Sequence, residues 1–299
     1  MPLPPLPDPS DPRVRLSGLT VGVPASAFLF STLLAFNVAQ TASLAVRPVS
    51  RKTFRKFNRW AADSWWGLCV TSAEVLHDVQ IVVTGDPVPP RENAVVFANH
   101  QQMPDITFLM AYARSKDRLG DLKWFAKDII KYVPGVGWGM WFLDCPFVKR
   151  DWSKDRDSID QTFARIRQDR IPIWLVTFPE GTRITPDKAD RSRQYARDHG
   201  LPVWEHVLVP RTKGFVATIH GLRPHLDAVY DVTIGYERGV PTLWQYIKGF
   251  VRKAHLHVRR FPVETVPVED DAIARWLLDR FDEKNRLLDG FYRDGKFPD

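Results

Sequence analysis

Cysteine is scarce in this sequence, which has Cys69 and Cys145 as its two cysteines among 299 residues. Two thiols cannot form a framework of several disulfides, and neither stands in a metal-binding spacing such as CxxC. We therefore expect the folded part to belong to a reducing compartment. The sequence also lacks an internal repeat, so it does not indicate a repeat architecture.

Charge is absent from the 31 residues 16–46. A helix needs about 20 predominantly apolar residues to cross a bilayer, so this stretch is long enough. Pro24, Asn37 and Gln40 dilute its apolar character. We predict a membrane segment that either spans once or bends and re-enters as a hairpin. A cleaved signal peptide is the alternative, although its apolar region is usually only ~7 to 15 residues long.

Positive charge dominates the residues that follow. Six basic residues precede the next acid, and these are Arg47, Arg51, Lys52, Arg55, Lys56 and Arg59. Positive flanks of membrane segments stay in the cytosol, so we expect the bulk of the chain to face the cytosol. The formal charge of +7 suits nucleic acid, an anionic membrane or a phosphorylated substrate. The adjacent uncharged stretch argues against nucleic acid, and 11 Trp and 18 Phe suit a membrane interface.

Residues 47–78 place Phe54, Phe57, Ala61 and Trp65 at helical spacing. We interpret this region as a basic amphipathic helix that lies on the membrane, and a core helix packed against the domain is the alternative. Residues 1–15 are predicted to be a disordered leader, because the first 14 residues include six prolines.

From residue 79 onward, short apolar runs alternate with helix-like stretches, and residues 271–292 form a further amphipathic helical pattern. Strands interleaved with helices indicate an α/β domain. The predicted strands are VQIVV (79–83), AVVFA (94–98), PIWLVTF (172–178) and VLVP (207–210).

The first chemical motif is Asn99-His100-Gln101-Gln102-Met103-Pro104-Asp105, directly after the strand AVVFA. Pro104 favours a helix that begins there. An acid five residues after a histidine, at a strand-to-helix turn, can reach back to the imidazole and fix its tautomer. Such a histidine can serve as a general base, although an ordinary capping Asp and a structural His fit the pattern as well.

The second motif, Phe178-Pro179-Glu180-Gly181-Thr182-Arg183, completes the run PIWLVTF. Gly181 lets the backbone approach a ligand, Thr182 offers a hydroxyl, and Arg183 offers a bidentate fork for phosphate. Two further segments carry basic residues, and these are Phe147-Val148-Lys149-Arg150 and Val209-Pro210-Arg211-Thr212-Lys213-Gly214-Phe215.

These four segments, in this order, resemble the glycerolipid acyltransferase family, whose signature is NHxxxxD followed by EGTR. The family's arginine-bearing motif and its proline turn resemble 147–150 and 209–214. The resemblance runs from about residue 93 to 240. Residues 259–270 and the helical stretch after them are similar to the C-terminal extension of a eukaryotic subgroup. That subgroup comprises lysophosphatidic acid, lysocardiolipin and lysophosphatidylinositol acyltransferases.

The resemblance implies a central mixed sheet flanked by helices, with a catalytic domain over 79–240 and a C-terminal extension over 241–299. It implies that His100 is the general base and that Asp105 orients it. The residues expected to bind substrate are Lys149, Arg150, Glu180, Gly181, Thr182 and Arg183. Asn99, Pro210 and Gly214 are the expected oxyanion or acyl-CoA contacts. The pair Lys149-Arg150 departs from the family's commoner bacterial form.

The implied partners are acyl-CoA as a co-substrate, a lysophospholipid and the bilayer, with no cofactor and no metal. Lysophosphatidic acid is the default acceptor, and lysophosphatidylinositol and lysocardiolipin stay open. The endoplasmic reticulum is the expected membrane, with the mitochondrial outer membrane and the lipid droplet as alternatives. A non-catalytic lipid-binding protein and a His/Asp hydrolase that cleaves thioesters or phospholipids are the competing functions.

Overall fold

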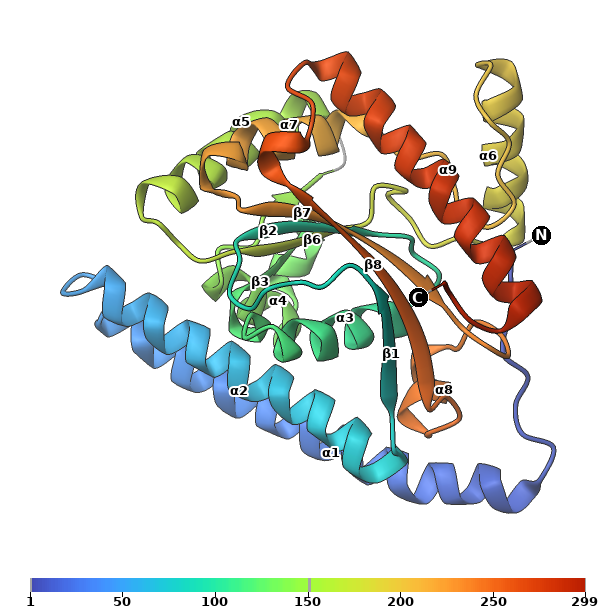
Figure 1. Cartoon of the computed structure of the whole chain (residues 1–299). Helices are drawn as coiled ribbons and strands as arrows, with labels where there is room; N and C mark the ends of the chain where they lie inside the picture. Colours follow the sequence, from blue (N-terminus) through green and yellow to red (C-terminus); the bar gives the residue numbers. More distant parts are fainter. Residues whose placement is uncertain (1, 150–151, 299) are drawn as a thin grey trace.

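The computed structural model describes residues 2–149 and 152–298, and a six-stranded sheet lies at its centre (Figure 1). The strand order is β1-β8-β7-β2-β6-β3. β2, β3, β6 and β7 run parallel, whereas β8 is antiparallel to β7 and parallel to β1. The predicted α/β class with a mixed sheet is confirmed. The strands are β1 (Gln80–Gly85), β2 (Ala94–Ala98), β3 (Leu122–Trp124), β6 (Trp174–Thr177), β7 (Ala228–Gly235) and β8 (Lys253–Pro262).

Helices cover both faces of this sheet (Figure 1). One apolar core joins the sheet to α2, α3 and α8, and a second core joins it to α5, α7 and α9. The pair α1–α2 runs antiparallel along one side, and α6 projects from the opposite side. The helices are α1 (Pro12–Ala42), α2 (Arg51–His77), α3 (Pro104–Ser115), α4 (Val136–Phe142), α5 (Trp152–Gln168), α6 (Pro186–Asp198), α7 (Thr212–Leu222), α8 (Leu243–Ile247) and α9 (Asp270–Asp294).

Shorter elements connect these layers. A small two-stranded sheet pairs β4 (Ala126–Lys127) with β5 (Phe147–Val148). Short 3-10 helices occupy several turns, and they are η1 (Ser43–Ala45), η2 (Leu119–Asp121), η3 (Asp128–Tyr132), η4 (Arg223–His225) and η5 (Val263–Thr265).

The central strands are apolar on both faces because both faces carry helices. Every residue of β2 and of β7 is buried, which explains why AVVFA has no alternation of polar and apolar residues. Three of the four predicted strands are present as β1, β2 and β6. The fourth, 207–210, is wrong. Val207 is buried in the second core, but both edges of β6 are already paired, with β2 and β3.

The first residues of the chain differ from the disordered leader that we predicted. The Leu6 amide donates to the Val240 carbonyl at 2.9 Å, and the Val240 amide donates to the Pro4 carbonyl at 2.9 Å. The Gln245 side-chain amide donates to the Leu6 carbonyl at 2.9 Å, and Leu3 packs against the first core. The segment has a fixed place because the loop before α8 supplies the partners that its extended backbone lacks internally.

The C-terminal extension is part of the sheet rather than an appendage. β8 lies between β1 and β7, and α9 packs on β7. The predicted extension therefore shares one sheet with the predicted catalytic domain, because without β8 the strand β1 has no partner in the sheet, and the boundary at residue 240 stays a prediction. From this strand order we expect that the chain needs residues 241–299 to fold.

Candidate active site

The two chemical motifs meet at the carboxyl ends of neighbouring strands in the sheet. β2 and β6 are parallel neighbours, so the segments that follow them leave the sheet side by side. The Ile184 amide donates to the His100 carbonyl at 2.9 Å, and the Arg183 guanidinium donates to the Gln102 side-chain carbonyl. The His100 ring and the Arg183 fork therefore belong to one site.

His100 and Asp105 form a hydrogen-bonded pair. His100 Nδ1 lies 2.8 Å from Asp105 Oδ2, and the histidine side chain is 13% exposed. Since a carboxylate only accepts, Nδ1 carries the proton and the Nε2 lone pair is left open. Within the described residues, Nε2 has no hydrogen-bond partner. In this arrangement Nε2 could accept a proton while Asp105 holds the ring.

Asp105 is fixed by three further donors. The amides of Gln101 and Gln102 donate to Oδ2 at 2.7 and 2.9 Å. The Tyr236 hydroxyl, from the residue after β7, donates to Oδ1 at 2.5 Å. Burial, followed by the charge of Asp105, raises the pKa of Tyr236 well above its ordinary value, so the phenol stays a donor. Asp105 also lies in the first turn of α3, where the helix dipole favours a negative charge.

Sequence reasoning missed Tyr236. It stands 131 residues from Asp105 in the chain, and a tyrosine among buried apolar residues resembles any other core aromatic. The available signal was its place directly after a strand-like run, where a hydroxyl would reach the same sheet edge as His100.

Aromatic rings hold the histidine from one side. The Phe178 ring stacks on His100 with centroids 4.0 Å apart and an interplanar angle of 17°. Trp124, at the end of β3, stacks on Phe178 at 6.4 Å and 20°. The imidazole is therefore restrained both by its hydrogen bond and by this stack.

A tight turn follows β6 and positions Glu180. The Gly181 amide donates to the Phe178 carbonyl at 2.9 Å, which closes a turn with Pro179 and Gly181 at favoured positions. Glu180 points inward: its side chain accepts from the His100 amide at 3.2 Å, and the residue is 3% exposed. Burial raises the pKa of Glu180 well above its ordinary value of 4.5. Its place is behind His100, where it supports the histidine backbone.

The raised pKa of Glu180 predicts a pH-dependent effect of Glu180→Gln. The folded state prefers the protonated carboxyl, so its contribution to stability is present below pH 4.5 and is lost as the pH rises through the higher folded-state pKa. The neutral amide still accepts from the His100 amide. We expect Glu180→Gln to match the wild type near pH 4 and to exceed its free energy of unfolding by roughly 1 kcal/mol at pH 7.

Urea unfolding of both proteins across this pH range tests the effect. Exposed Glu264 provides the matched control, because Glu264→Gln removes a carboxyl that is already solvated. A stability gain that does not change between pH 4 and pH 7, or a loss at pH 7, contradicts the assignment.

Basic side chains surround the outer side of this turn. Arg183 is exposed. Among the described residues, its guanidinium has a hydrogen bond to Gln102, and its other N–H donors can reach a ligand. Lys188, at the start of α6, donates to the Thr182 hydroxyl at 2.7 Å and to the Arg183 carbonyl at 3.1 Å. The Arg211 side chain lies across Gly181. Lys188 was not among the predicted site residues. It lies five residues after Arg183, in the first turn of α6, from which its side chain reaches back to the loop.

The other predicted residues lie at different distances from this cluster. Asn99 is buried, and its amide donates to the Ile234 carbonyl and accepts from the Ile234 amide, which ties β2 to β7. An oxyanion role for Asn99 would require those bonds to break.

Pro210 is buried and Gly214 lies exposed in the first turn of α7. Lys149 is exposed after β5, where its amide donates to Asp155 at 2.7 Å. Arg150 lies outside the described residues.

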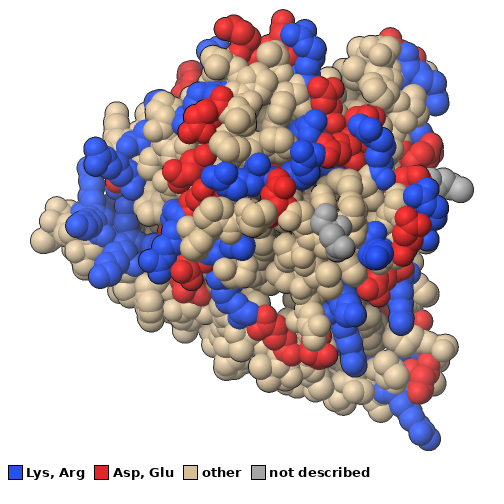
Figure 2. Space-filling model, viewed as in Figure 1, with Lys and Arg blue, Asp and Glu red and all other residues tan. Residues whose placement is uncertain are grey.

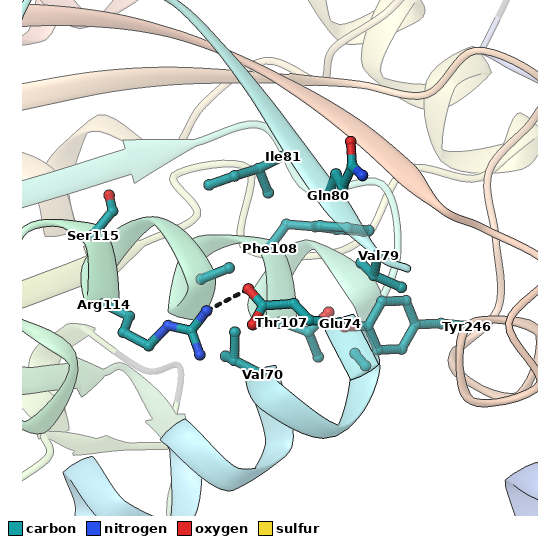
Figure 3. Close-up of a pocket in the computed structure, with 12 residues that line it drawn as sticks. Val70, Glu74, Val79, Gln80, Ile81, Thr107, Phe108, Arg114, Ser115 and Tyr246 are labelled. Atoms are coloured by element: carbon teal, nitrogen blue, oxygen red, sulfur yellow. Dashed lines mark hydrogen bonds and ion pairs between the residues drawn. The ribbon is translucent and has the colours of Figure 1, made fainter. Parts of the chain in front are cut away.

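A separate cavity of about 280 Å³ lies between α2, β1 and α3 (Figure 3). Phe108 and Tyr246 line it, and the Arg114–Glu74 ion pair stands on one side. None of the predicted site residues lines this cavity. Within residues 2–149 and 152–298, no three His, Cys, Asp or Glu side chains converge to hold a metal ion. That catalysis uses no metal stays a prediction.

Comparisons with known proteins place this geometry in context. A sequence model described as acyltransferase matches residues 80–237, and one described as acyltransferase C-terminus matches residues 245–299. Probable 1-acyl-sn-glycerol-3-phosphate acyltransferase 5 of Arabidopsis thaliana is 33% identical over 257 residues, which cover 86% of this chain and 68% of the relative. Lysocardiolipin acyltransferase 1 of Danio rerio is 37% identical over 245 residues, which cover 78% and 62%.

A solved structure is similar in fold. The crystal structure of the 1-acyl-sn-glycerophosphate (LPA) acyltransferase PlsC from Thermotoga maritima aligns with a TM-score of 0.54. The alignment covers 93% of this chain and 97% of that chain at 16% sequence identity. At this identity the likeness concerns the fold alone.

Proposed function

This chain belongs to the acyltransferase family, and from this premise we propose that it transfers an acyl group from acyl-CoA to the free hydroxyl of a lysophospholipid. The observation that carries the proposal is the His100–Asp105 pair, whose open Nε2 shares a site with the Arg183 guanidinium. Relatives named for 1-acyl-sn-glycerol-3-phosphate and for lysocardiolipin support a lysophospholipid acceptor.

In the proposed reaction, His100 Nε2 takes the proton of the acceptor hydroxyl while the oxygen attacks the thioester carbonyl. The carbon–oxygen bond of the new ester forms and the carbon–sulfur bond breaks. The imidazolium gives the proton to the departing sulfur, so coenzyme A leaves as a thiol and His100 becomes neutral again. The imidazolium is stabilised by Asp105, which Tyr236 and two backbone amides hold in place. No serine or cysteine nucleophile is needed, because the acceptor supplies its own hydroxyl.

The basic cluster around the turn is proposed to hold the acceptor phosphate. Arg183 can form bidentate hydrogen bonds with a phosphate, and Lys188 keeps Thr182 and the Arg183 carbonyl in place. Fixing the phosphate orients the hydroxyl toward Nε2 and makes the attack effectively intramolecular. Glu180 enters this proposal as a positioning residue rather than as a phosphate contact, since it faces inward.

Gly181 links the turn to Arg211 and predicts a second activity effect. A Cβ at Gly181 would lie 3.1 Å from the Arg211 guanidinium stem, and the glycine has a φ of +70°. We expect Gly181→Ala to lower kcat/KM about tenfold by displacing that guanidinium, in addition to a stability loss of about 1 kcal/mol from the left-handed backbone. Gly200→Ala is the matched control, because Gly200 has a φ of +64° and no atom within 4 Å. Equal activity losses in the two variants would contradict a role for this contact.

We propose that the chain works at a membrane, with its catalytic domain on the cytosolic side and the endoplasmic reticulum as the favoured compartment. The stretch Pro12–Ala45, which comprises α1 and η1, is long and apolar enough to cross a bilayer by length and composition. The basic residues of the α1–α2 connection gather at one end of the pair, as Figure 2 shows, and suit an anionic leaflet.

An in-plane position is favoured by the contacts of α1. Near its start, a Cβ at Gly18 would lie 2.9 Å from the Lys248 carbonyl. Near its middle, the Trp65 indole of α2 donates to the Leu29 carbonyl at 3.1 Å. Because one side of α1 stays on the domain along its length, we propose that α1 lies along the leaflet rather than across it.

A panel of acceptors tests the proposed function. Purified protein is mixed with one acyl-CoA and, in turn, with lysophosphatidic acid, lysophosphatidylinositol, monolysocardiolipin or neutral monoacylglycerol, and products are read by mass spectrometry. We expect lysophosphatidic acid to be acylated most efficiently. Arg183→Ala should raise the KM for phosphate-bearing acceptors about tenfold or more, because charge-assisted hydrogen bonds contribute about 1.5 to 3 kcal/mol.

Arg191 on α6 is the matched control for this substitution, since it is exposed and its guanidinium donates only to a neighbouring carbonyl among the described residues. Arg191→Ala should leave the KM unchanged. If Arg183→Ala leaves the KM for every phosphate-bearing acceptor unchanged, the phosphate assignment is wrong.

A further inference from the structure

Residues 128–142 form a compact lobe with exposed apolar side chains. The lobe comprises η3 and α4. The chain enters it from β4 and leaves it into β5, and these two strands pair with each other. Six large apolar side chains on it are between 43% and 67% exposed, and these are Ile129, Tyr132, Val133, Val136, Trp138 and Trp141. So many apolar side chains on 15 neighbouring residues indicate a binding surface rather than isolated exposed residues.

The lobe is bonded to the side of α1 that carries its polar residues. The Gly135 amide donates to Asn37 Oδ1 at 2.9 Å, and the Asn37 side-chain amide donates to Gln40 Oε1 at 3.1 Å. Asn37 is 2% exposed, and Leu33 lies against Gly135. Asn37 and Gln40, two of the residues that dilute the apolar character of 16–46, therefore face this lobe.

Positive charge borders the lobe. The Arg47 guanidinium lies 6.0 Å from the Trp141 ring centroid, and Arg47 begins the basic run before α2. Lys131, within the lobe, lies over the Tyr132 ring at 5.0 Å and pairs with Asp128 at 2.7 Å, so the inference depends on Arg47 as the cation. Figure 2 shows Lys and Arg side chains gathered at the end of the molecule where α2 begins. Aromatic and apolar side chains edged by cations match the headgroup region of an anionic leaflet.

We propose that residues 128–142 insert into the headgroup region of an anionic phospholipid leaflet and form a membrane contact in addition to α1. The inference rests on the membrane association proposed above. It also explains the position of the lobe, because Trp124, which ends β3 two residues before β4, belongs to the ring stack on His100. On this proposal the lobe would hold the leaflet near the strand end that carries Trp124 and, through the ring stack, His100.

A fluorescent depth probe tests the insertion without any substrate. Ile129→Cys is labelled with an environment-sensitive dye in the full chain. The labelled protein is mixed with vesicles of phosphatidylcholine and phosphatidic acid, because an anionic leaflet attracts a basic surface. Insertion predicts a blue shift, quenching by lipids brominated on the acyl chain, and protection from aqueous iodide. The labelled Val268→Cys, exposed next to α9 and remote from the lobe, should stay accessible to iodide.

The proposal is overturned if the dye at residue 129 stays equally accessible to iodide while the chain is bound to vesicles. It is also overturned if, without lipid, sedimentation shows a dimer and the dye at residue 129 is protected from iodide. The surface would then bind a second copy of the chain. Neither outcome depends on catalysis, so the test is separate from the proposed function.

An activity measurement provides the second readout. Ile129→Glu combined with Val136→Glu should reduce acylation of a vesicle-embedded acceptor about tenfold, which corresponds to about 1.4 kcal/mol. The same variant should act normally on a monodisperse short-chain acceptor, as should Val268→Glu on both. Equal losses on both acceptors would indicate a folding defect and contradict the proposal, whereas inactivity of the wild type on both would refute the proposed function instead.

Discussion

Replacement of His100 by alanine is expected to lower kcat about 10²- to 10⁴-fold, the range that a general base contributes. The KM for either substrate should change little, because the proposed phosphate contacts and the acyl-CoA contacts do not involve the imidazole. Asp105→Asn should lower kcat by a similar factor, since the amide NH2 can donate to Nδ1 and leave the imidazole proton on Nε2, where it blocks the base. Initial rates of thiol release at saturating acyl-CoA and acceptor measure both changes.

His199 provides the matched control for this substitution. Its ring stacks on Tyr195 at 3.9 Å and bonds to a backbone carbonyl, so it resembles His100 in its contacts but lies at the end of α6. His199→Ala should retain wild-type rates. A His100→Ala protein that unfolds at the wild-type temperature and keeps more than about a tenth of the wild-type kcat would exclude the base mechanism.

Lys284→Met is expected to destabilise the fold by about 3 to 5 kcal/mol, the usual result when one partner of a buried ion pair is removed. Lys284 on α9 is fully buried and donates to the Asp231 carboxylate and, at 2.7 Å, to the Val232 carbonyl. Methionine fills the volume but removes the cation that contacts the buried Asp231 carboxylate. Because Lys284 joins the C-terminal extension to the central sheet, its loss should loosen α9 as well.

Urea unfolding measures the loss, and two further variants define its origin. Arg293→Met removes an exposed cation on the same helix, which pairs with its neighbour Asp294, and should change stability by less than about 0.5 kcal/mol. Lys284→Met combined with Asp231→Leu should recover much of the stability, because it removes the uncompensated charge. A single variant as stable as the wild type would show that α9 is not anchored through this pair.

The site was predictable to the extent that it depends on strand order. His100 follows β2 and Arg183 follows the end of β6, and parallel neighbours bring such positions together. The helix that begins at Pro104 returns Asp105 to the imidazole, as the five-residue spacing indicated. These inferences needed only local patterns and one pairing.

Residues that depend on distant pairings were not predictable in the same way. Tyr236 reaches Asp105 because β7 lies on the other side of β2, a neighbour that no local pattern specifies. Glu180 was expected to face the substrate, but the turn directs it behind His100. Lys284 occupies a core position in the apolar stripe of α9, which is visible in the sequence, although its partner Asp231 is not.

The most direct measurement of the central claim is thiol release by the wild-type protein with acyl-CoA, in the presence and absence of lysophosphatidic acid. The account predicts that thiol and diacylated product appear together in equal amounts, and that release without the acceptor is negligible. Equal release with and without the acceptor would show a hydrolase. Absence of release with every acceptor would contradict the proposed transfer and favour a lipid-binding protein without catalysis.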